Sequence, residues 1–206
     1  MVAELEIVQI QAGRMDNFSY LIYCPSSREA VAVDPSLEPQ RLLAEAARRE
    51  LKLVALLNTH GHQDHTAGNR QILDAADIPL AGHAADLAEA DILLEEGSLL
   101  NVGQGSIDVL HTPGHTPGSL VFSTGNAIVT GDTLFVSRCG RADLPGSDVN
   151  RLYESLQRLK KLPPETQVFP GHDYGPQPVS TIGWELEHND FLRCPDLESF
   201  IRLRMG

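Results

Sequence analysis

Four side chains that can bind a metal ion lie within six consecutive positions of the chain. The segment 58–68 reads NTHGHQDHTAG and contains His60, His62, Asp64 and His65. Residues two apart in an extended segment point the same way, so His60 and His62 can share one ion. If the chain then enters a helix, Asp64 and His65 turn toward a second position. Imidazole and carboxylate donors suit zinc, iron and manganese, so this segment predicts a metal site.

Three further candidate ligands are His115, Asp132 and His172. Each is flanked by glycine, proline or both, residue types that let the backbone turn sharply and hold a side chain outward. Each also follows an apolar run that is typical of a strand. Loops at the carboxyl ends of strands are where sites form in α/β folds. We therefore expect all three side chains to join the histidine segment.

The elements that would position these residues alternate between short strands and amphipathic helices. Hydrophobic periodicity and turn residues mark their bounds. Strands are predicted at 5–10, 18–23, 30–33, 53–57, 78–81, 106–110, 120–122, 127–130 and 167–169, and helices at 38–50, 67–76, 84–90 and 149–162. This order favours an α/β fold with a sheet core and helices outside.

Composition limits the class of protein and its partners. The chain has 206 residues, 42% of them hydrophobic, and a net charge of -12. This indicates one globular domain over 1–206 with a short helical tail from about 183, and it excludes a disordered chain. Nucleic acid and anionic membranes require clustered cations and are not expected as partners. An oligomer is compatible with the sequence.

The compartment is predicted from the cysteines and the N-terminus. Cys24, Cys139 and Cys194 are an odd and scattered set, so neither a disulfide framework nor a closed thiolate zinc site is expected. The first residues carry two glutamates and no basic segment, and no apolar run approaches the length of a membrane helix. A cytoplasmic location is the expectation.

The motifs together resemble the metallo-β-lactamase fold superfamily. HGHQDH at 60–65 matches the HxHxDH signature of that superfamily, and His115, Asp132 and His172 match its other ligand motifs in the same order. The resemblance extends from the first strands to His172. It implies a four-layer αββα sandwich, with two mixed sheets face to face and the metal site at one edge.

By this resemblance the site holds two divalent metal ions, zinc or a mixture of zinc, iron and manganese. His60, His62 and His115 would hold the first ion, Asp64, His65 and His172 the second, and Asp132 would bridge them. The ions would activate a water molecule as hydroxide for attack on a thioester carbonyl. Asp64 and Asp132 are the carboxylates expected to take part in catalysis, Asp64 at most as a proton relay.

Within the superfamily the sequence is most similar to the glyoxalase II and persulfide dioxygenase groups. The stretches 131–135, 139–141 and 171–174 carry this similarity. In glyoxalase II the positions of Arg141 and Tyr174 contact glutathione, so the substrate is expected to be a small thiol-derived molecule such as a glutathione conjugate. A structural role, with Arg141 paired to an aspartate and Tyr174 packed, is the alternative. Only 34 residues follow His172, so further glutathione contacts from a longer C-terminal region are not expected.

Two other functions remain open. The stretch 138–143 looks more like persulfide dioxygenases, in which one Fe(II) would be held by His60, His115 and Asp132 and would oxidise glutathione persulfide to sulfite. Those enzymes keep the remaining ligands, so the ligand set does not discriminate between the two chemistries. A non-catalytic metal-binding scaffold is the third interpretation. His83, His111 and His188 are expected to be ordinary side chains.

Overall fold

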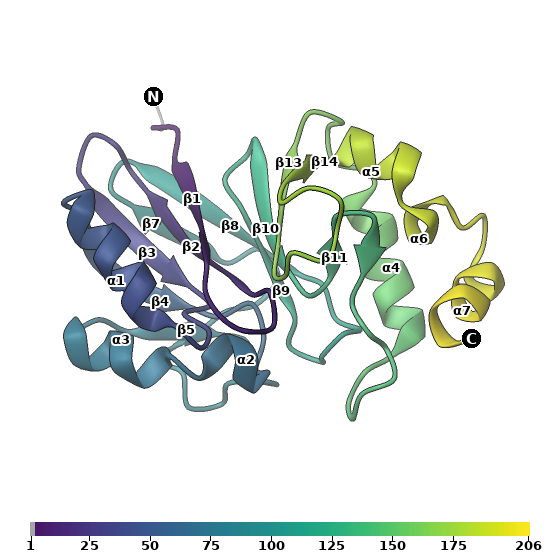
Figure 1. The fold of residues 1–206 in the computed structure, drawn as a ribbon, viewed down its shortest axis with the longest axis horizontal. Coiled ribbons are helices and arrows are strands. Elements are labelled where there is room, and N and C mark those ends of the chain that lie inside the picture. Colours follow the sequence, from purple (N-terminus) through teal and green to yellow (C-terminus); the bar gives the residue numbers. More distant parts are fainter. Residues whose placement is uncertain (1–2) are drawn as a thin grey trace.

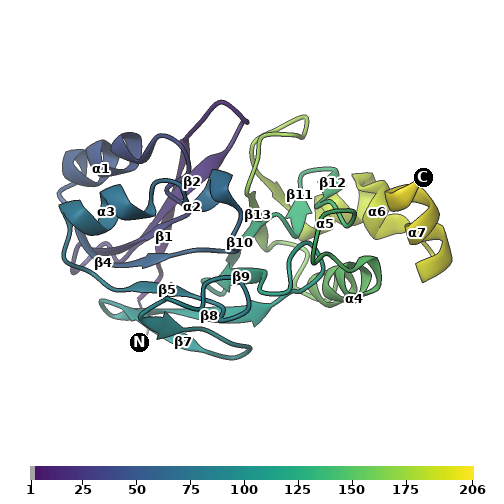
Figure 2. The same cartoon turned by 90° about the horizontal axis from the view of Figure 1, so that it is seen from below.

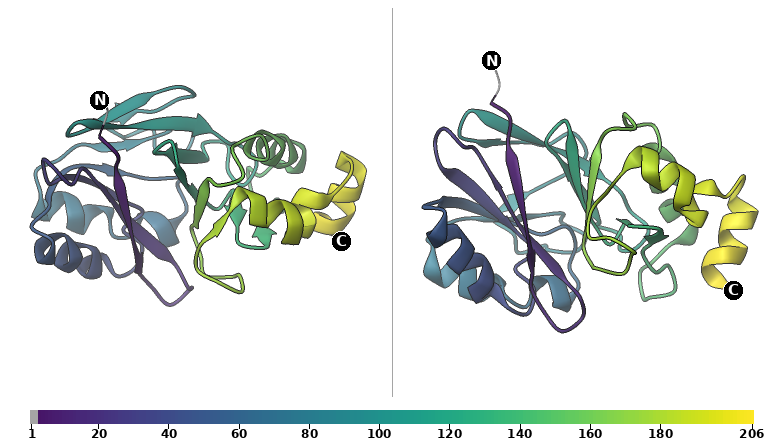
Figure 3. Two further views of the ribbon diagram at one scale, coloured as in Figure 1. Left: turned by 90° about the horizontal axis from the view of Figure 1, so that it is seen from above. Right: turned by 45° about the horizontal axis from the view of Figure 1, so that its top comes forward.

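Two six-stranded sheets face each other, and helices cover the outer face of each sheet (Figure 1). The structure is a computed structural model that describes residues 3–206. Figure 2 and Figure 3 show the same layers from three further directions. The predicted four-layer αββα sandwich is confirmed.

The first sheet contains the N-terminal strands in sequential order. It begins as an antiparallel meander, and its later strands are parallel, with helical connections from β3 to β4 and from β4 to β5 and a connection made of turns from β5 to β6. Its strands are β1 (Glu6–Gln11), β2 (Phe18–Tyr23), β3 (Glu29–Val33), β4 (Lys52–Leu57), β5 (Leu80–Gly82) and β6 (Ile92–Leu93). Helices α1 (Pro39–Arg48) and α3 (Asn69–Ala75) lie on its outer face, and α2 (Gln63–Thr66) is a single turn after β4.

The second sheet has the order β14-β13-β10-β9-β8-β7, with one parallel pair, β10 and β13. Its strands are β7 (Leu99–Val102), β8 (Gly105–His111), β9 (Leu120–Ser123), β10 (Ala127–Gly131), β13 (Gln167–Pro170) and β14 (Ser180–Thr181). Helices α4 (Val149–Leu159), α5 (Ile182–His188), α6 (Asp190–Arg193) and α7 (Leu197–Met205) lie on its side of the molecule. A separate hairpin joins β11 (Leu134–Phe135) to β12 (Arg138–Cys139).

Three apolar cores correspond to the three interfaces between the four layers. Alternation along the strands divides the side chains: in β2, Tyr20 and Ile22 face the other sheet, whereas Leu21 packs with the helices of the first layer. Phe122 of β9 is fully buried in the core between the sheets. The third core joins the second sheet to α4 and the C-terminal helices.

The helix predicted at 84–90 is wrong. These residues form successive turns, in which the N–H groups of Asp86 and Leu87 both donate to the carbonyl of His83. The reason is the Asp86 carboxylate, which accepts hydrogen bonds from two other loops and holds this segment away from helical geometry. The strands that sequence analysis missed are two to four residues long, too short for a periodic pattern: β6, β7, β11, β12 and β14.

Between residues 3 and 206, every helix falls short of the length and apolar character that crossing a bilayer requires.

The core between the sheets predicts a sharp contrast between two substitutions. Phe122→Ala should lower the free energy of unfolding by about 3–5 kcal/mol, because it empties a fully buried site between two rigid sheets. Leu99→Ala, at a side chain 57% exposed on an edge strand, should change it by less than about 0.5 kcal/mol. Urea denaturation of both variants measures this, and equal losses would contradict the assignment of this core.

Candidate metal centre

Seven predicted ligands meet at one edge of the sandwich, at the carboxyl ends of four strands. His60, His62, Asp64 and His65 follow β4, with His65 inside the single turn of α2. The others come from the second sheet: His115 lies in the loop after β8, Asp132 directly follows β10, and His172 follows β13. Both sheets therefore contribute to the centre, and the structure brings together every ligand position that the sequence singled out.

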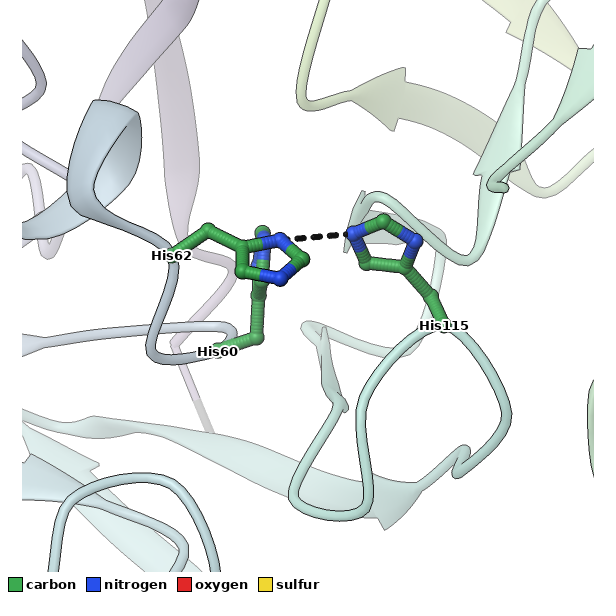
Figure 4. A group of neighbouring side chains, drawn as sticks. All are labelled: His60, His62 and His115. Atoms are coloured by element: carbon green, nitrogen blue, oxygen red, sulfur yellow. Dashed lines mark hydrogen bonds between the residues drawn. The ribbon is translucent and has the colours of Figure 1, made fainter. Parts of the chain in front are cut away.

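The first donor group consists of His60, His62 and His115 (Figure 4). Nδ1 of His62 lies 3.1 Å from Nε2 of His60 and 2.9 Å from Nε2 of His115. The three nitrogens thus lie within 4.8 Å of one another, and Figure 4 shows His62 and His115 pointing toward each other. His60 and His115 are buried, whereas His62 is partly exposed.

The second donor group consists of Asp64, His65 and His172. The Nε2 atoms of the two histidines are 3.1 Å apart. Oδ2 of Asp64 lies 3.5 Å from Nε2 of His65 and 3.3 Å from Nε2 of His172. Asn17, which is fully buried, donates its side-chain amide to this carboxylate over 3.0 Å and fixes its orientation.

Asp132 lies between the two groups and offers one oxygen to each. Its Oδ2 is 3.4 Å from Nε2 of His115, and its Oδ1 is 3.2 Å from Nε2 of His65 and 3.4 Å from Nε2 of His172. Oδ1 is buried and makes no hydrogen bond to any residue described. A buried carboxylate oxygen without a donor is costly, and a cation would satisfy it.

The outer ring nitrogens of four histidines are held by acceptors. These partners are Oγ1 of Thr59 for His60, Oδ2 of Asp34 for His65, the carbonyl of Arg141 for His115 and the carbonyl of Met15 for His172. The hydroxyl of Thr59 donates to Asp34 and so accepts from His60. Each Nδ1–H therefore points outward, and each Nε2, once it has lost any proton it carries, presents a lone pair to the centre. Lone pairs this close repel unless a cation lies between them, so the residues fit two bound metal ions.

The surroundings of the centre favour the ionised form of Asp132 and the neutral rings of His60 and His62. Burial lowers the pKa of His60 well below its usual value and also lowers that of His62. Although burial opposes it, the charge of His65 holds the pKa of Asp132 well below its usual range. Burial likewise opposes the shift at His172, but the neighbouring carboxylates of Asp132 and Asp64 stabilise its protonated ring and raise its pKa to about 9. A metal ion must therefore displace a proton from the second group, and its affinity there depends on pH.

Asp34 is a functional residue that sequence analysis missed. It directly follows β3, has φ +46° and is almost completely buried. Its Oδ1 accepts hydrogen bonds from the backbone N–H of Thr59 and from the side-chain amide of Asn58, just after β4. Its Oδ2 accepts from the hydroxyl of Thr59 and from Nδ1 of His65. The signal was an aspartate at a strand end, the same position that Asp132 has after β10.

Asp86 joins the two loops of the first donor group. Its Oδ2 accepts from the N–H of Gly61, between two ligands, and from the hydroxyl of Thr116, beside His115. Its Oδ1 accepts from the N–H of Gly118 over 2.9 Å. No sequence signal marked Asp86, because it lies within a segment that resembles a helix.

The two predicted substrate contacts line the open side of the centre. The cavity there has a volume of about 190 Å³, and Arg141 and Tyr174 contribute to its wall. The ring of Tyr174 stacks on His172 at 4.6 Å between centroids. Arg141 pairs through two hydrogen bonds with Asp143, the structural role that sequence analysis kept as an alternative. Substrate binding by both residues stays a prediction.

The other histidines lie outside the donor groups found in residues 3–206. His83 and His111 stack on each other, and His188 stacks on Trp184.

Comparison with known proteins identifies relatives with similar sequence and fold. A hydroxyacylglutathione hydrolase of Rhodospirillum rubrum is 38% identical over 204 residues, which cover 96% of this chain and 77% of that protein. The crystal structure of ETHE1 from Myxococcus xanthus matches with a TM-score of 0.92 and 33% identity, over 98% of this chain and 90% of that one.

A third relative bears on the number of metal ions. The protein TTHA1623, solved in a di-iron-bound form, matches with a TM-score of 0.79 and 35% identity, over 89% of this chain and 99% of that one. The family model described as the metallo-β-lactamase superfamily matches residues 12–172, a span that contains both donor groups. The chain therefore belongs to the metallo-β-lactamase superfamily.

Proposed function

We propose that the protein is a metal-dependent hydrolase that cleaves a thioester of a small thiol carrier. The observation that carries this proposal is the position of Asp132, which offers one carboxylate oxygen to each of two donor groups. That arrangement suits two ions held side by side. A di-iron form of a 35% identical relative supports the same number of ions.

The residues of the chain divide into those that would hold metal and those that would orient substrate. The two donor groups would hold one ion each, with Asp132 between them. Bound divalent ions would supply Lewis-acid polarisation of a carbonyl oxygen and would strongly lower the pKa of a coordinated water, toward about 7. Asp64 is held by Asn17 and partly exposed to the cavity, so it can also relay a proton.

The cavity is suited to a leaving group that departs without a proton. Of its titratable lining residues, all but Arg141 and Tyr174 belong to the donor groups or are Asp132. An amide nitrogen needs a general acid to leave, whereas a thiolate leaves readily because the pKa of its thiol is about 8.5. A thioester therefore requires no general acid from this lining.

We propose glutathione, or a thiol of similar charge, as the carrier. The Rhodospirillum rubrum relative is named a hydroxyacylglutathione hydrolase. Arg141 offers a planar donor pair that suits a carboxylate, and the partly exposed ring of Tyr174 offers an apolar face. Three free cysteines fit a location in the reducing cytoplasm.

A persulfide dioxygenase with one Fe(II) is the second candidate. The stretch 138–143 favours it, because its sequence resembles that group of enzymes. His60, His115 and Asp132 would supply the two-histidine, one-carboxylate set of a non-heme iron site. The position of His62, with Nδ1 within 3.1 Å of both histidine donors, is compatible with both candidates, because both groups of enzymes keep this ligand.

Metal content tests the two donor groups. The wild type should bind about two divalent ions per chain, and His60→Ala and His172→Ala should each retain about one, because each removes a donor from a different group. Asp132→Ala should weaken metal binding at both donor groups. Plasma emission spectroscopy after dialysis measures the stoichiometry. His83→Ala is the matched control, and full retention of two ions in His60→Ala would contradict the assignment.

Activity with the metal-loaded protein separates the two chemistries. Zinc-loaded protein should hydrolyse S-lactoylglutathione, and iron-loaded protein should consume no oxygen with glutathione persulfide, because the arrangement suits two ions bridged by Asp132. Thiol release and an oxygen electrode measure the two reactions. Oxygen uptake without thioester hydrolysis would establish the second candidate in place of the first.

Arg141 should affect the binding of an anionic thioester more than its chemistry. Arg141→Ala should raise KM for a glutathione thioester by about tenfold, as loss of a charged hydrogen bond predicts. Asp143→Asn should lower KM, because it releases the guanidinium from its pair. Steady-state kinetics measures both, with Arg70→Ala on α3 as the control. An unchanged KM in Arg141→Ala would show that the carrier does not bind there.

A further inference from the structure

We propose that a second cavity, beside the metal centre, binds the anionic end of the thiol carrier, with Arg138 as the residue that recognises it. This inference rests on the proposed thioester hydrolase function. The ligand chemistry is a flexible, partly apolar thiol that ends in a carboxylate or a phosphate.

The second cavity adjoins the catalytic one at Tyr174. It has a volume of about 380 Å³ and lies between the β11–β12 hairpin and helices α6 and α7. Tyr174 lines both cavities. The catalytic cavity, at about 190 Å³, is smaller than the about 300–1,000 Å³ typical of sites that enclose a whole small molecule. A substrate whose reacting group sits there must therefore place the rest of its length elsewhere, and the second cavity is adjacent.

The lining of the second cavity combines a free cation with apolar walls. Arg138 is exposed and has no ion-pair partner within residues 3–206, whereas Asp190, the carboxylate in the same lining, pairs with Arg193 at 3.5 Å. Tyr174 and Leu203 are large side chains 42% and 46% exposed in this cavity. A guanidinium recognises carboxylate or phosphate, and the apolar walls suit a carbon chain leading to it.

The wall that carries Arg138 is fixed in place. Ser137, the preceding residue, has φ +62°, a backbone conformation that costs free energy for a residue other than glycine. The carboxylate of Glu185, fully buried on α5, accepts from the N–H of Ser137 over 2.9 Å and from Asn189 over 2.7 Å. Asn189 in turn donates to the carbonyl of Arg138 over 3.0 Å. The C-terminal helices thus hold the turn in one conformation before any ligand binds, which lowers the entropic cost of recognition.

Kinetics with three thioesters tests the proposal. The substrates are S-acetylglutathione, acetylated 4′-phosphopantetheine and the short neutral S-acetyl-N-acetylcysteamine. Arg138→Ala should lower kcat/KM for one or both anionic substrates by about tenfold relative to the neutral one, chiefly through KM, and Arg138→Lys should recover part of the loss. A loss confined to S-acetylglutathione identifies a carboxylate, and a loss confined to the pantetheine substrate identifies a phosphate.

Two further variants sharpen the result. Asp190→Asn should lower KM for the anionic substrates, because it removes a negative charge from the same cavity. Arg151→Ala, at an exposed arginine of α4 outside the lining, should leave all three substrates unaffected. Equal changes for anionic and neutral substrates in Arg138→Ala would overturn the proposal.

A binding measurement separates this inference from the proposed function. Calorimetry with S-methylglutathione and with S-methyl-4′-phosphopantetheine needs no turnover. Arg138→Ala should raise the Kd of the recognised conjugate by about tenfold, and an unchanged Kd for both would overturn the inference even if thioesters are hydrolysed. If the metal-loaded protein hydrolyses no thioester, the proposed function fails, and the Kd values alone decide whether the cavity binds the carrier.

Discussion

The carboxylate of Asp34 is the interaction on which the metal centre depends. It is buried between the end of β3 and the end of β4, and it accepts four hydrogen bonds, from Asn58, from Thr59 twice and from His65. A buried charge is tolerated only when its lone pairs are satisfied, so the positions of these donors are coupled. Through Thr59 and His65 the same carboxylate sets the ring orientation of one ligand in each donor group. Asp34 thereby couples the relative position of the ends of β3 and β4 to the ring orientations of two metal ligands, one in each donor group.

Asp86 imposes a comparable constraint from the other side of the first donor group. It joins the loop of His60 and His62 to the loop of His115, two segments that are far apart in the sequence. The close approach requires glycine at both loops, because a Cβ at Gly61 would lie 2.9 Å from the Asp86 carbonyl oxygen and one at Gly118 would lie 2.6 Å from its Cγ. Gly61 and Gly118 therefore allow close packing against Asp86, in addition to letting the chain turn.

The sequence predicted the ligands better than it predicted what holds them. Ligands such as His60 and Asp132 were found because spacing within one segment, or a position directly after an apolar strand, is a local signal. Asp34 and Asn17 act through contacts with residues that are 24 to 47 positions away, and no local pattern encodes such pairings. The same reason explains the helix wrongly predicted at 84–90: its residues favour a helix locally, but the hydrogen bonds of Asp86 to other loops prevail. Strands of two residues, such as β11 and β12, exist only because partners are present across the sheet or hairpin.

Each donor group draws its members from both sheets, so metal binding and closure of the sandwich are coupled. His60 and His62 come from the first sheet and meet His115 from the second, whereas Asp64 and His65 meet His172. Without a cation, ring nitrogens of the first donor group converge across the interface, and the apolar core between the sheets must oppose their repulsion. With a cation, each group becomes a cross-link between β4 and a loop of the other sheet, and the free energy of metal binding adds to that of folding. Metal binding would therefore stabilise the same edge of the sandwich at which the catalytic cavity opens. The strands that hold the two donor groups would then stay fixed while the cavity remains open to substrate.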